Sequence, residues 1–317
     1  MRAIQISEFG GPEVLVLREV EEPTPEGEEI MIDVEAAGVN WGDTHQAEDS
    51  YAAPSPLPLI PGLEVVGTTS DGRRVVALLP DRGGYAEKAA SVEPHIHQIP
   101  DRMDSHAALA VVLQGATAWH LLRTATHMVD GEKVLVHAGA GGVGSLAIQL
   151  AKRWGASTVV ATASSEDKRQ ICRDLGADAA IDSTEAKLTE AILDAAGGPV
   201  NVVLEMSGGR VTEQSLRALA PLGRLAFYGM ASRKPPAPVD LVTLLQHGHT
   251  VVGFWLQHVF GRPALNRGPV QELLDYVDRG ELKTLHGGTY PLSEATRAHE
   301  DIRSRSTTGK LTIDPRL

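Results

Sequence analysis

The chain has 317 residues, of which 42% are hydrophobic and 22% charged, and this composition excludes a mainly disordered protein. At roughly 150 residues per domain, the length indicates two domains. The net charge is −12, from 29 basic and 41 acidic residues, and it disfavours nonspecific binding to nucleic acid or to anionic lipid.

The sequence also carries an expectation about the compartment. No apolar run approaches the ~18 residues that a membrane-spanning helix requires, and residues 1–11 contain neither a signal-peptide core nor a transit-peptide pattern. The single cysteine, Cys172, cannot form an internal disulfide bond, and one thiol is too few for a structural zinc site built from cysteines. We therefore expect a cytoplasmic protein that does not bind membranes.

The first part of the chain is predicted to form strands. Short β-type runs between turn signals predict strands over residues 2–7, 15–19, 30–36, 64–69, 74–79 and 85–90. Four prolines exclude a helix between residues 52 and 62, where we expect an extended loop.

Strands and helices alternate in the middle of the chain. Two apolar segments rich in helix formers, 105–113 and 116–124, come first. They are followed by strand 133–137, helix 145–154, strand 158–161, helix 167–175, strand 200–204, helix 213–219 and strand 224–228. This alternation predicts βαβ units and a parallel, doubly wound sheet.

The last part of the chain returns to a mixed pattern, with helix 270–279, strand 287–290, helix 293–303 and strand 309–313. We therefore expect an α/β fold with two domains. A doubly wound domain, residues 117–255, is inserted into a β-rich domain that residues 1–116 and 256–317 form together.

A glycine-rich segment predicts a dinucleotide site. Residues 137–145 contain Gly139-x-Gly141-x-x-Gly144, directly after a predicted strand and directly before a predicted helix, with a second strand about twenty residues later. Such glycines allow a tight turn and close approach of a pyrophosphate, which the N–H groups of the helix N-terminus then bind. The alternative, a flexible loop, does not account for this context.

The end of the second strand of this motif favours NADPH. An NAD site places an acidic residue there, whereas this chain has Ala163 and Ser164. The side chains that can supply hydroxyls and cations to a 2′-phosphate are Ser164, Ser165, Lys168 and Arg169. In the alternative interpretation Ser165 only caps a helix whose first turn contains Glu166 and Asp167, and both roles can hold together.

Short motifs along the chain carry a family resemblance. They are Ala37-Gly-Val-Asn40, Gly62-x-Glu64-x-x-Gly67, Gly84-Tyr-Ala-Glu87, Gly115-Ala-Thr117-Ala118, Leu175-Gly-Ala177-Asp178, Asn201-Val-Val-Leu204 and Thr308-Gly-Lys310. In this order and spacing, the chain resembles the zinc-free quinone oxidoreductase (zeta-crystallin-like) branch of the medium-chain dehydrogenase/reductase superfamily. The resemblance implies a GroES-like catalytic domain, an inserted Rossmann domain, a cleft between them and a homodimer.

The resemblance also implies that no metal ion takes part. Zinc-dependent relatives carry Cys where this chain has Asn40, His where it has Leu63, and a second Cys near Gln114. The remaining acid, Glu64, cannot hold a metal ion alone. Without a Lewis acid, we expect hydride transfer to the β-carbon of an enone, quinone or enoyl thioester rather than to an isolated ketone.

Three residues are predicted to act in this chemistry. Tyr51 is the candidate proton donor, or else a loop aromatic packed on the proline segment. Asn40 is the candidate amide near nicotinamide and substrate, or else an Asn that holds a turn. Thr117 resembles the family threonine at the cofactor, or else caps a helix.

The remaining cofactor residues follow from the glycine-rich turn and from the resemblance. The predicted set is Gly139, Gly141, Gly142, Val143, Gly144, Met206, Gly229, Phe254, Trp255, Leu256 and Lys310. The strand at 250–256 can equally be an edge strand that pairs across a dimer, and Lys310 can equally be a surface lysine. Ser183 and Met230 replace a Tyr and an Asn common in relatives, so a moderate affinity for NADPH is expected.

The sequence leaves two other functions open. One is an NADPH-dependent ketone or aldehyde reductase of a biosynthetic pathway. The other is a non-catalytic NADPH-binding protein of the crystallin or RNA-binding type, and the net charge of −12 argues against RNA binding.

Overall fold

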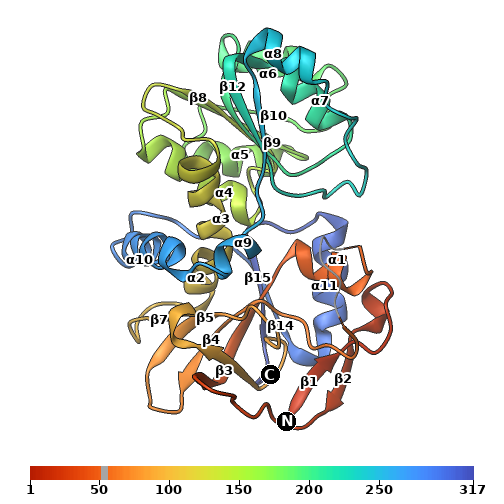
Figure 1. Cartoon of the computed structure of the whole chain (residues 1–317), viewed down its shortest axis with the longest axis vertical. Helices are drawn as coiled ribbons and strands as arrows, with labels where there is room; N and C mark the ends of the chain where they lie inside the picture. Colours follow the sequence, from red (N-terminus) through yellow and green to blue (C-terminus); the bar gives the residue numbers. More distant parts are fainter. Residues whose placement is uncertain (51–55) are drawn as a thin grey trace. The chain divides into compact units, whose positions relative to one another are not determined.

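A computed structural model describes residues 1–50 and 56–317 of the chain. The chain divides into two compact units (Figure 1). The first unit, here the β-rich unit, consists of Met1–Ala116 and Gln257–Leu317, and the second, here the Rossmann unit, of Thr117–Leu256.

The Rossmann unit contains a six-stranded parallel sheet with the strand order β10-β9-β8-β11-β12-β13. The strands are β8 (Lys133–Val136), β9 (Thr158–Ala163), β10 (Ala179–Asp182), β11 (Val200–Glu205), β12 (Leu219–Phe227) and β13 (Thr250–Gly253). Numbered from β8, this is the order 3-2-1-4-5-6 of a doubly wound dinucleotide-binding fold. The predicted parallel sheet is thereby confirmed.

Helices connect these strands and cover the sheet. They are α3 (Ala116–His120), the π-helical turn η4 (Leu121–Ala125), α4 (Gly142–Arg153), α5 (Glu166–Asp174), α6 (Leu188–Ala196), α7 (Arg210–Arg217) and α8 (Leu241–His247). The fully buried Leu188 and Ile192 of α6 pack on a core of strand residues that includes Leu135, Val160 and Val203. Burial of this apolar surface holds the helix layer on the sheet.

The β-rich unit contains a mostly antiparallel sheet with the order β14-β15-β3-β4-β5-β7, in which β6 also pairs with β3. Its strands are β3 (Glu29–Val39), β4 (Glu64–Thr69), β5 (Arg74–Leu78), β6 (Lys88–Val92), β7 (Ile96–Gln98), β14 (His286–Pro291) and β15 (Lys310–Asp314). β1 (Arg2–Gln5) and β2 (Val16–Glu19) form a separate antiparallel pair. Leu311 of β15 pairs with Val39 of β3, so late and early parts of the chain share one sheet.

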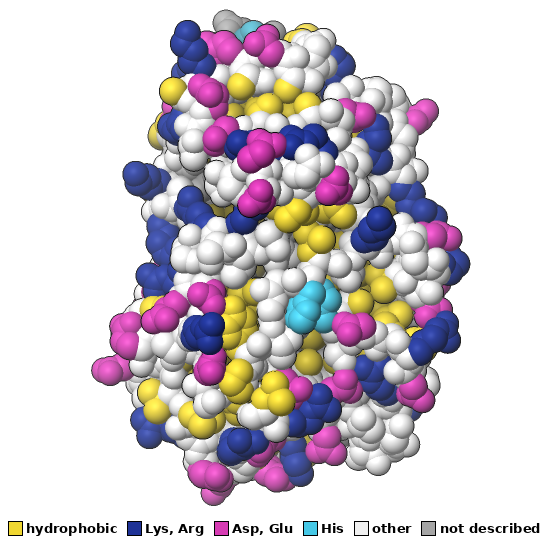
Figure 2. All heavy atoms as spheres, turned by 180° about the vertical axis from the view of Figure 1, so that it is seen from behind, with side chains coloured by type: hydrophobic (Ala, Val, Ile, Leu, Met, Phe, Trp, Pro, Cys, Tyr) yellow, Lys and Arg dark blue, Asp and Glu magenta, His cyan; other side chains and the backbone are white. Residues whose placement is uncertain are grey.

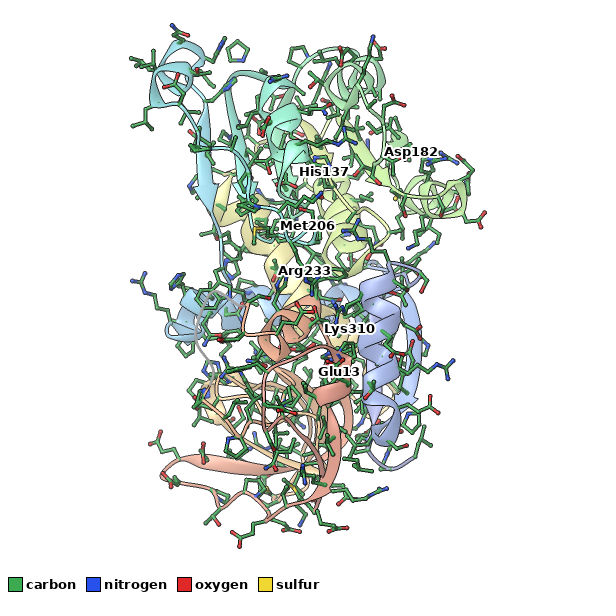
Figure 3. The ribbon with its side chains drawn as sticks, turned by 90° about the vertical axis from the view of Figure 1, so that its right-hand side faces the viewer. Glu13, His137, Asp182, Met206, Arg233 and Lys310 are labelled. Carbon is green, nitrogen blue, oxygen red and sulfur yellow. The ribbon has the colours of Figure 1, made fainter. Side chains whose placement is uncertain are left out.

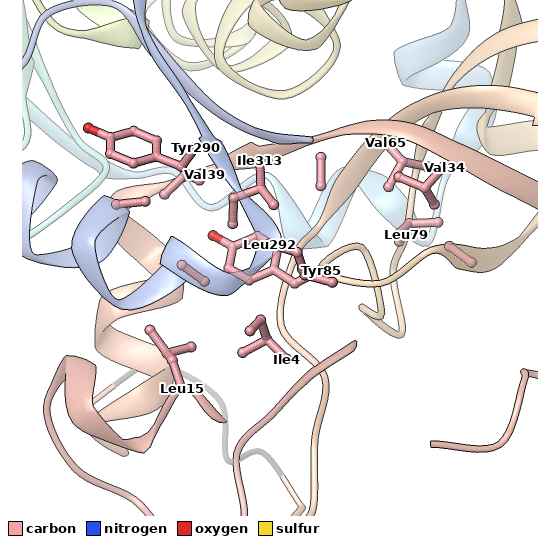
Figure 4. Packing of buried hydrophobic residues seen from close by; sticks show 14 of the residues in the cluster. Ile4, Leu15, Val34, Val39, Val65, Leu79, Tyr85, Tyr290, Leu292 and Ile313 are labelled. Atoms are coloured by element: carbon pink, nitrogen blue, oxygen red, sulfur yellow. The ribbon is translucent and has the colours of Figure 1, made fainter. Parts of the chain in front are cut away.

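Helices and a large apolar core complete the β-rich unit. The helical elements are η1 (Pro12–Val14), α1 (Trp41–Ala47), η2 (Glu93–His95), α2 (Ser105–Leu109), η3 (Ala110–Gly115, π-helical), α9 (Gln257–Phe260), α10 (Pro263–Asp278), η5 (Leu292–Glu294) and α11 (Ala295–Ser304). Figure 4 shows Ile4, Val65, Tyr85 and Ile313 meeting in the core. Strands and helices from both segments of the unit contribute to it.

Some elements of the structure differ in extent from the prediction, and others were not predicted. β10, α6, α8 and α9 were not predicted, because each is short and the first two follow one another with little turn signal. The strand predicted from Tyr85 begins only at Lys88, since residue 85 pairs through its backbone with Pro61 and Ile4 instead. Leu219 was predicted as helical but begins β12.

The surface carries both signs of charge. Over the face shown in Figure 2, Lys and Arg side chains are interspersed with Asp and Glu. Among the helices of the described residues, none is both long and apolar enough to cross a lipid bilayer.

Candidate active site

The glycine-rich turn lies between β8 and α4, at the carboxyl end of the parallel sheet. α4 begins at Gly142, three residues earlier than predicted, with Gly141 in extended conformation as its N-cap. Gly142, Val143 and Gly144 therefore form the first turn of the helix, whose N–H groups have no partners within the helix. These N–H groups can bind an anion such as a pyrophosphate.

Two glycines of the turn are required by close packing. A Cβ atom at Gly144 would overlap the carbonyl oxygen of Ala138. A Cβ atom at Gly139 would lie 2.7 Å from Sγ of Cys172 and 2.9 Å from Cβ of Ala161. The absence of side chains lets the turn approach its neighbours and leaves its outer side open for a ligand.

His137 supports this turn from inside the unit, and sequence reasoning did not single it out. Figure 3 labels His137 within the Rossmann unit. Its Nδ1 lies 3.0 Å from Oγ1 of Thr162 and its Nε2 lies 2.7 Å from Oγ of Ser215. Burial lowers the pKa of His137 to about 4, so the ring is neutral at physiological pH. The imidazole thus joins β8 to β9 and α7 without introducing a buried charge.

The residues predicted to bind a 2′-phosphate follow β9. Ser164 is exposed, and Lys168 is partly buried, which lowers the pKa of its ammonium group. Oγ of Ser165 accepts a hydrogen bond from the backbone N–H of Lys168 at 3.3 Å, so Ser165 is the N-cap of α5. The structure thus shows the capping role that was the alternative for Ser165.

Arg169 and its acidic neighbours are engaged with one another. Nε of Arg169 lies 3.0 Å from Glu166, and its Nη1 lies 3.2 Å from Asp182. Glu166 also pairs with Arg173. The pairs with Arg173 and Arg169 lower the pKa of Glu166. Hydrogen bonds from Thr184, and then the charge of Arg169, lower the pKa of Asp182. The arginines also compensate the acidic charge that would otherwise oppose a phosphate near Ser164.

The other predicted cofactor residues of the Rossmann unit lie at or near the carboxyl ends of β11, β12 and β13. Met206 follows β11, and its Cβ atom would be 3.3 Å from a Cβ atom placed on Gly229. Glu205, which was not predicted, is fully buried and accepts hydrogen bonds from Oγ1 of Thr212 at 2.6 Å and from N of Ser207 at 2.5 Å. This carboxylate fixes the loop that begins at Met206.

The segment after β13 and the start of α3 carry the remaining candidates of this unit. The ring of Phe254 stacks on His120, with 5.9 Å between the ring centroids. Leu256 is buried, and Thr117 is 7% exposed. Trp255 lies between Phe254 and Leu256 and is partly buried.

The β-rich unit contains a buried polar network around Asn40. Nδ2 of Asn40 donates to both carboxylate oxygens of Glu64, at 2.9 Å each. Oδ1 of Asn40 accepts from Nζ of Lys310 at 2.9 Å and from Nε2 of Gln114 at 3.3 Å. Lys310 also forms an ion pair with Glu64, and both side chains are 0% exposed. The interpretation of Lys310 as a surface lysine is therefore wrong.

A second buried group adjoins this network through helix α1. Oδ2 of Asp43 accepts from the backbone N–H of Asn40 at 2.8 Å and from the hydroxyl of Tyr85 at 2.9 Å. The same hydroxyl lies 3.2 Å from Nε2 of His299. Burial first, and then the nearby charge of Glu64, raise the pKa of Asp43 to about 7.

The positions that are zinc ligands in relatives carry side chains in this chain that are neutral or already paired. Asn40 and Gln114 offer neutral amides, which zinc rarely takes as ligands, and Glu64 is paired with Lys310. Among the described residues, no group of three or more His, Cys, Asp or Glu side chains is placed to hold a metal ion. Tyr51, the predicted proton donor, lies outside the described residues.

The strand order and the glycine-rich turn define a Rossmann-type dinucleotide-binding protein. A family model described as a zinc-binding dehydrogenase matches residues 142–276. The chain is 33% identical to a quinone oxidoreductase of Pseudomonas aeruginosa, with 99% of each chain covered. It is 30% identical to a 2-haloacrylate reductase of a Burkholderia species, with 99% of this chain and 98% of that protein covered.

A solved structure agrees with these relatives. The quinone oxidoreductase of Escherichia coli, complexed with NADPH, superposes with a TM-score of 0.92 at 30% identity, covering 99% of this chain and 100% of that one. The chain belongs to the quinone oxidoreductase family of the medium-chain dehydrogenase/reductase superfamily.

Proposed function

We propose that the protein is an NADPH-dependent oxidoreductase that transfers hydride to a quinone or to an activated carbon–carbon double bond without a metal ion. The observation that carries this proposal is the open first turn of α4 behind Gly139 and Gly144, combined with the absence of an acid at Ser164. The names of the relatives, a quinone oxidoreductase and a 2-haloacrylate reductase, support the reaction class.

The residues of the turn fit the cofactor. The backbone of Gly139, Gly141, Gly142, Val143 and Gly144 would hold the pyrophosphate, and Ser164 with Lys168 would hold the 2′-phosphate. Met206, Gly229 and the segment Phe254–Trp255–Leu256 are proposed to border the nicotinamide half. When bound, NADPH supplies the hydride.

Asn40 is held within the buried network. Its NH2 group donates to both carboxylate oxygens of Glu64 through one shared N–H, and its carbonyl oxygen accepts from Lys310 and Gln114. We therefore assign the carbonyl oxygen and one N–H of Asn40 to orienting its neighbours, which leaves its second N–H as the group that can face the substrate. Lys310, which is committed to this network, is also proposed to orient its neighbours.

Substrate activation is proposed to rest also on two side chains outside this network. Thr117 is the proposed hydroxyl contact near the cofactor, and Tyr51 the proposed source of the proton that completes the reduction. Glu64 cannot act as a metal ligand while it is paired with Lys310, and a neutral hydrogen-bonding site suits a delocalised enolate or quinol anion.

We further propose that two copies associate through the edge of the parallel sheet. β13 is the outer strand of that sheet, and beside it α8 exposes Leu241 to 76% and Leu245 to 82%. The side chain of Leu222, itself 73% exposed, lies beside Gly248 at the end of α8. An apolar patch next to an unpaired strand edge is typical of a self-association surface.

The proposed activity is tested by titrating the protein with NADPH and NADH, and then by following turnover with a panel of quinones and enones. The expected result is tighter binding of NADPH and a saturated ketone or a hydroquinone as product. Formation of an alcohol from a simple ketone would favour a carbonyl reductase instead, and failure to bind either nucleotide would refute the proposal.

A further inference from the structure

The side chain of Gln114 is the open end of the buried network. Gln114 lies in the π-helical turn η3 and is 8% exposed. Its Oε1 has no hydrogen-bond partner among the described residues. Such π-helical turns often occur at functional sites, and a buried acceptor without a donor is rare in folded proteins.

The orientation of this amide follows from the charges in the network. The ammonium of Lys310 can only donate, so Asn40 must present its oxygen to it, and its NH2 group to the carboxylate of Glu64, which only accepts. Gln114 must then present its NH2 group to the oxygen of Asn40. A flipped Gln114 amide would place two carbonyl oxygens against each other, so its oxygen is directed away from the network.

We propose that Oε1 of Gln114 is a ligand-binding acceptor that receives a hydrogen bond from an N–H or O–H group of a molecule bound at the active site. The proposal rests on the proposed function, because the donor belongs either to the carboxamide of NADPH or to a hydroxyl of the reduced product. Glu64, Lys310 and Asn40 hold the acceptor in place, whereas Gln114 contacts the ligand.

The chemistry of the acceptor makes the proposal specific. A carbonyl oxygen binds a quinol hydroxyl or an amide NH2 but repels the carbonyl oxygen of a quinone. A ligand that brings a donor relieves a buried acceptor that is otherwise left without a partner, and one neutral hydrogen bond of this kind changes affinity roughly three- to tenfold. Ligands whose donor is replaced by a methyl group or a methyl ether lose this contact.

The experiment compares two matched ligand pairs on the intact protein. The first pair is NADPH and its reduced 3-acetylpyridine analogue, in which a methyl group replaces the carboxamide NH2. The dissociation constants of both nucleotides are measured. The second pair is a hydroquinone and its dimethyl ether, for which inhibition constants are measured. Each affinity ratio is determined for the wild type, for Gln114→Met and for Gln114→Leu.

A control variant separates ligand contact from general destabilisation. Ser91→Ala removes another buried hydrogen bond of the β-rich unit, from Oγ of Ser91 to the carbonyl oxygen of Leu78 at 2.7 Å. We expect one of the two affinity ratios to fall roughly three- to tenfold in both Gln114 variants and to stay unchanged in Ser91→Ala. The pair that responds identifies the donor as cofactor or as product.

Two results would overturn the proposal. Unchanged ratios for both pairs in the Gln114 variants would give Gln114 a purely structural role. Affinity ratios near one for both ligand pairs in the wild type would also give Gln114 a purely structural role. This result does not depend on whether either variant folds. Failure of the proposed function is distinguishable, because a wild type that does not bind NADPH can still be tested with the hydroquinone pair.

Discussion

Both carboxylate oxygens of Glu64 lie 2.9 Å from Nδ2 of Asn40, so they share a hydrogen bond from its NH2 group. This contact fixes the direction in which the amide presents its nitrogen. The same carboxylate pairs with Lys310, so a single buried acid orders two side chains that come from opposite segments of the β-rich unit. Removal of this acid is the most direct perturbation of the site.

Glu64→Gln is expected to destabilise the fold strongly. It leaves the ammonium of Lys310 buried without a countercharge, which costs about 3–5 kcal/mol of unfolding free energy. Urea denaturation measures the loss. Glu93→Gln is the matched control, because it breaks the exposed pair with Arg73 and should cost under about 1 kcal/mol. Equal costs for both variants would contradict the importance of the buried pair.

Asp43 makes stability depend on pH. Its pKa is about 7 in the folded protein against 3.8 ordinarily, so the folded state binds the proton more tightly than the unfolded state does. The contribution of Asp43 to stability is therefore complete below pH 4 and is lost as pH rises to about 7, by about 1.4 kcal/mol per pH unit. Asp43→Asn keeps an oxygen for Tyr85 and should remove this slope, as unfolding free energies measured from pH 4 to 8 will show. A slope that persists in the variant would assign it to another group.

Gly144→Ala is expected to weaken NADPH binding. The new methyl group meets the carbonyl oxygen of Ala138 and displaces the first turn of α4. Overpacking of this kind costs about 1–3 kcal/mol, and a cost of that size on the binding conformation corresponds to roughly five- to 150-fold in the dissociation constant. Gly268→Ala in α10 meets open space and serves as the control, with unchanged binding. Nicotinamide fluorescence reports both, and full affinity in Gly144→Ala would exclude the turn as the pyrophosphate site.

Lys168→Ala is expected to reduce the preference for NADPH over NADH. Loss of a charge-assisted contact to the 2′-phosphate lowers affinity for NADPH roughly tenfold and leaves affinity for NADH unchanged. The exposed Lys187, which precedes α6, provides the control variant Lys187→Ala. A parallel loss for both nucleotides in Lys168→Ala would mean that the lysine acts on the fold rather than on the phosphate.

Leu245→Glu is expected to yield monomers. Leu245 is 82% exposed on α8 beside the sheet edge, so a charge there opposes burial between two copies. Sedimentation velocity distinguishes the states. Leu265→Glu, at a residue that is 50% exposed on α10, should leave the association unchanged. A wild type that is monomeric at micromolar concentration would remove the basis for the dimer.

Local patterns predicted most of the fold but not the buried network. The segment from β8 to α5 could be predicted because strand, glycine turn and capping residues lie close together in sequence. By contrast, β10 and α6 were missed: four residues, Ala179–Asp182, carry too weak a periodicity, and the N-cap residue of α6, Lys187, forms no capping hydrogen bond. The fold class and the family were nevertheless correct.

In the candidate site, too, individual residues could be predicted from local motifs, whereas their contacts could not. Asn40 and Lys310 were predicted from motifs, whereas their contact joins residues 270 positions apart and depends on the pairing of β15 with β3. The contacts of Tyr85 with Asp43 and His299 span 42 and 214 positions. Sequence spacing holds no information about such pairs, because only the tertiary fold brings them together. The roles of the predicted catalytic and cofactor residues remain predictions.

The pairing of β15 with β3 also sets an order of events during synthesis. All of the Rossmann unit leaves the ribosome before Lys310 does, so its parallel sheet can form while β3 is paired with β4 and β6 but still lacks β15. Asn40 and Glu64 are therefore synthesised long before their partner Lys310, which is translated 270 residues after Asn40. The glycine-rich turn can therefore fold before the buried polar network exists, and the network is complete only when β15 has paired with β3.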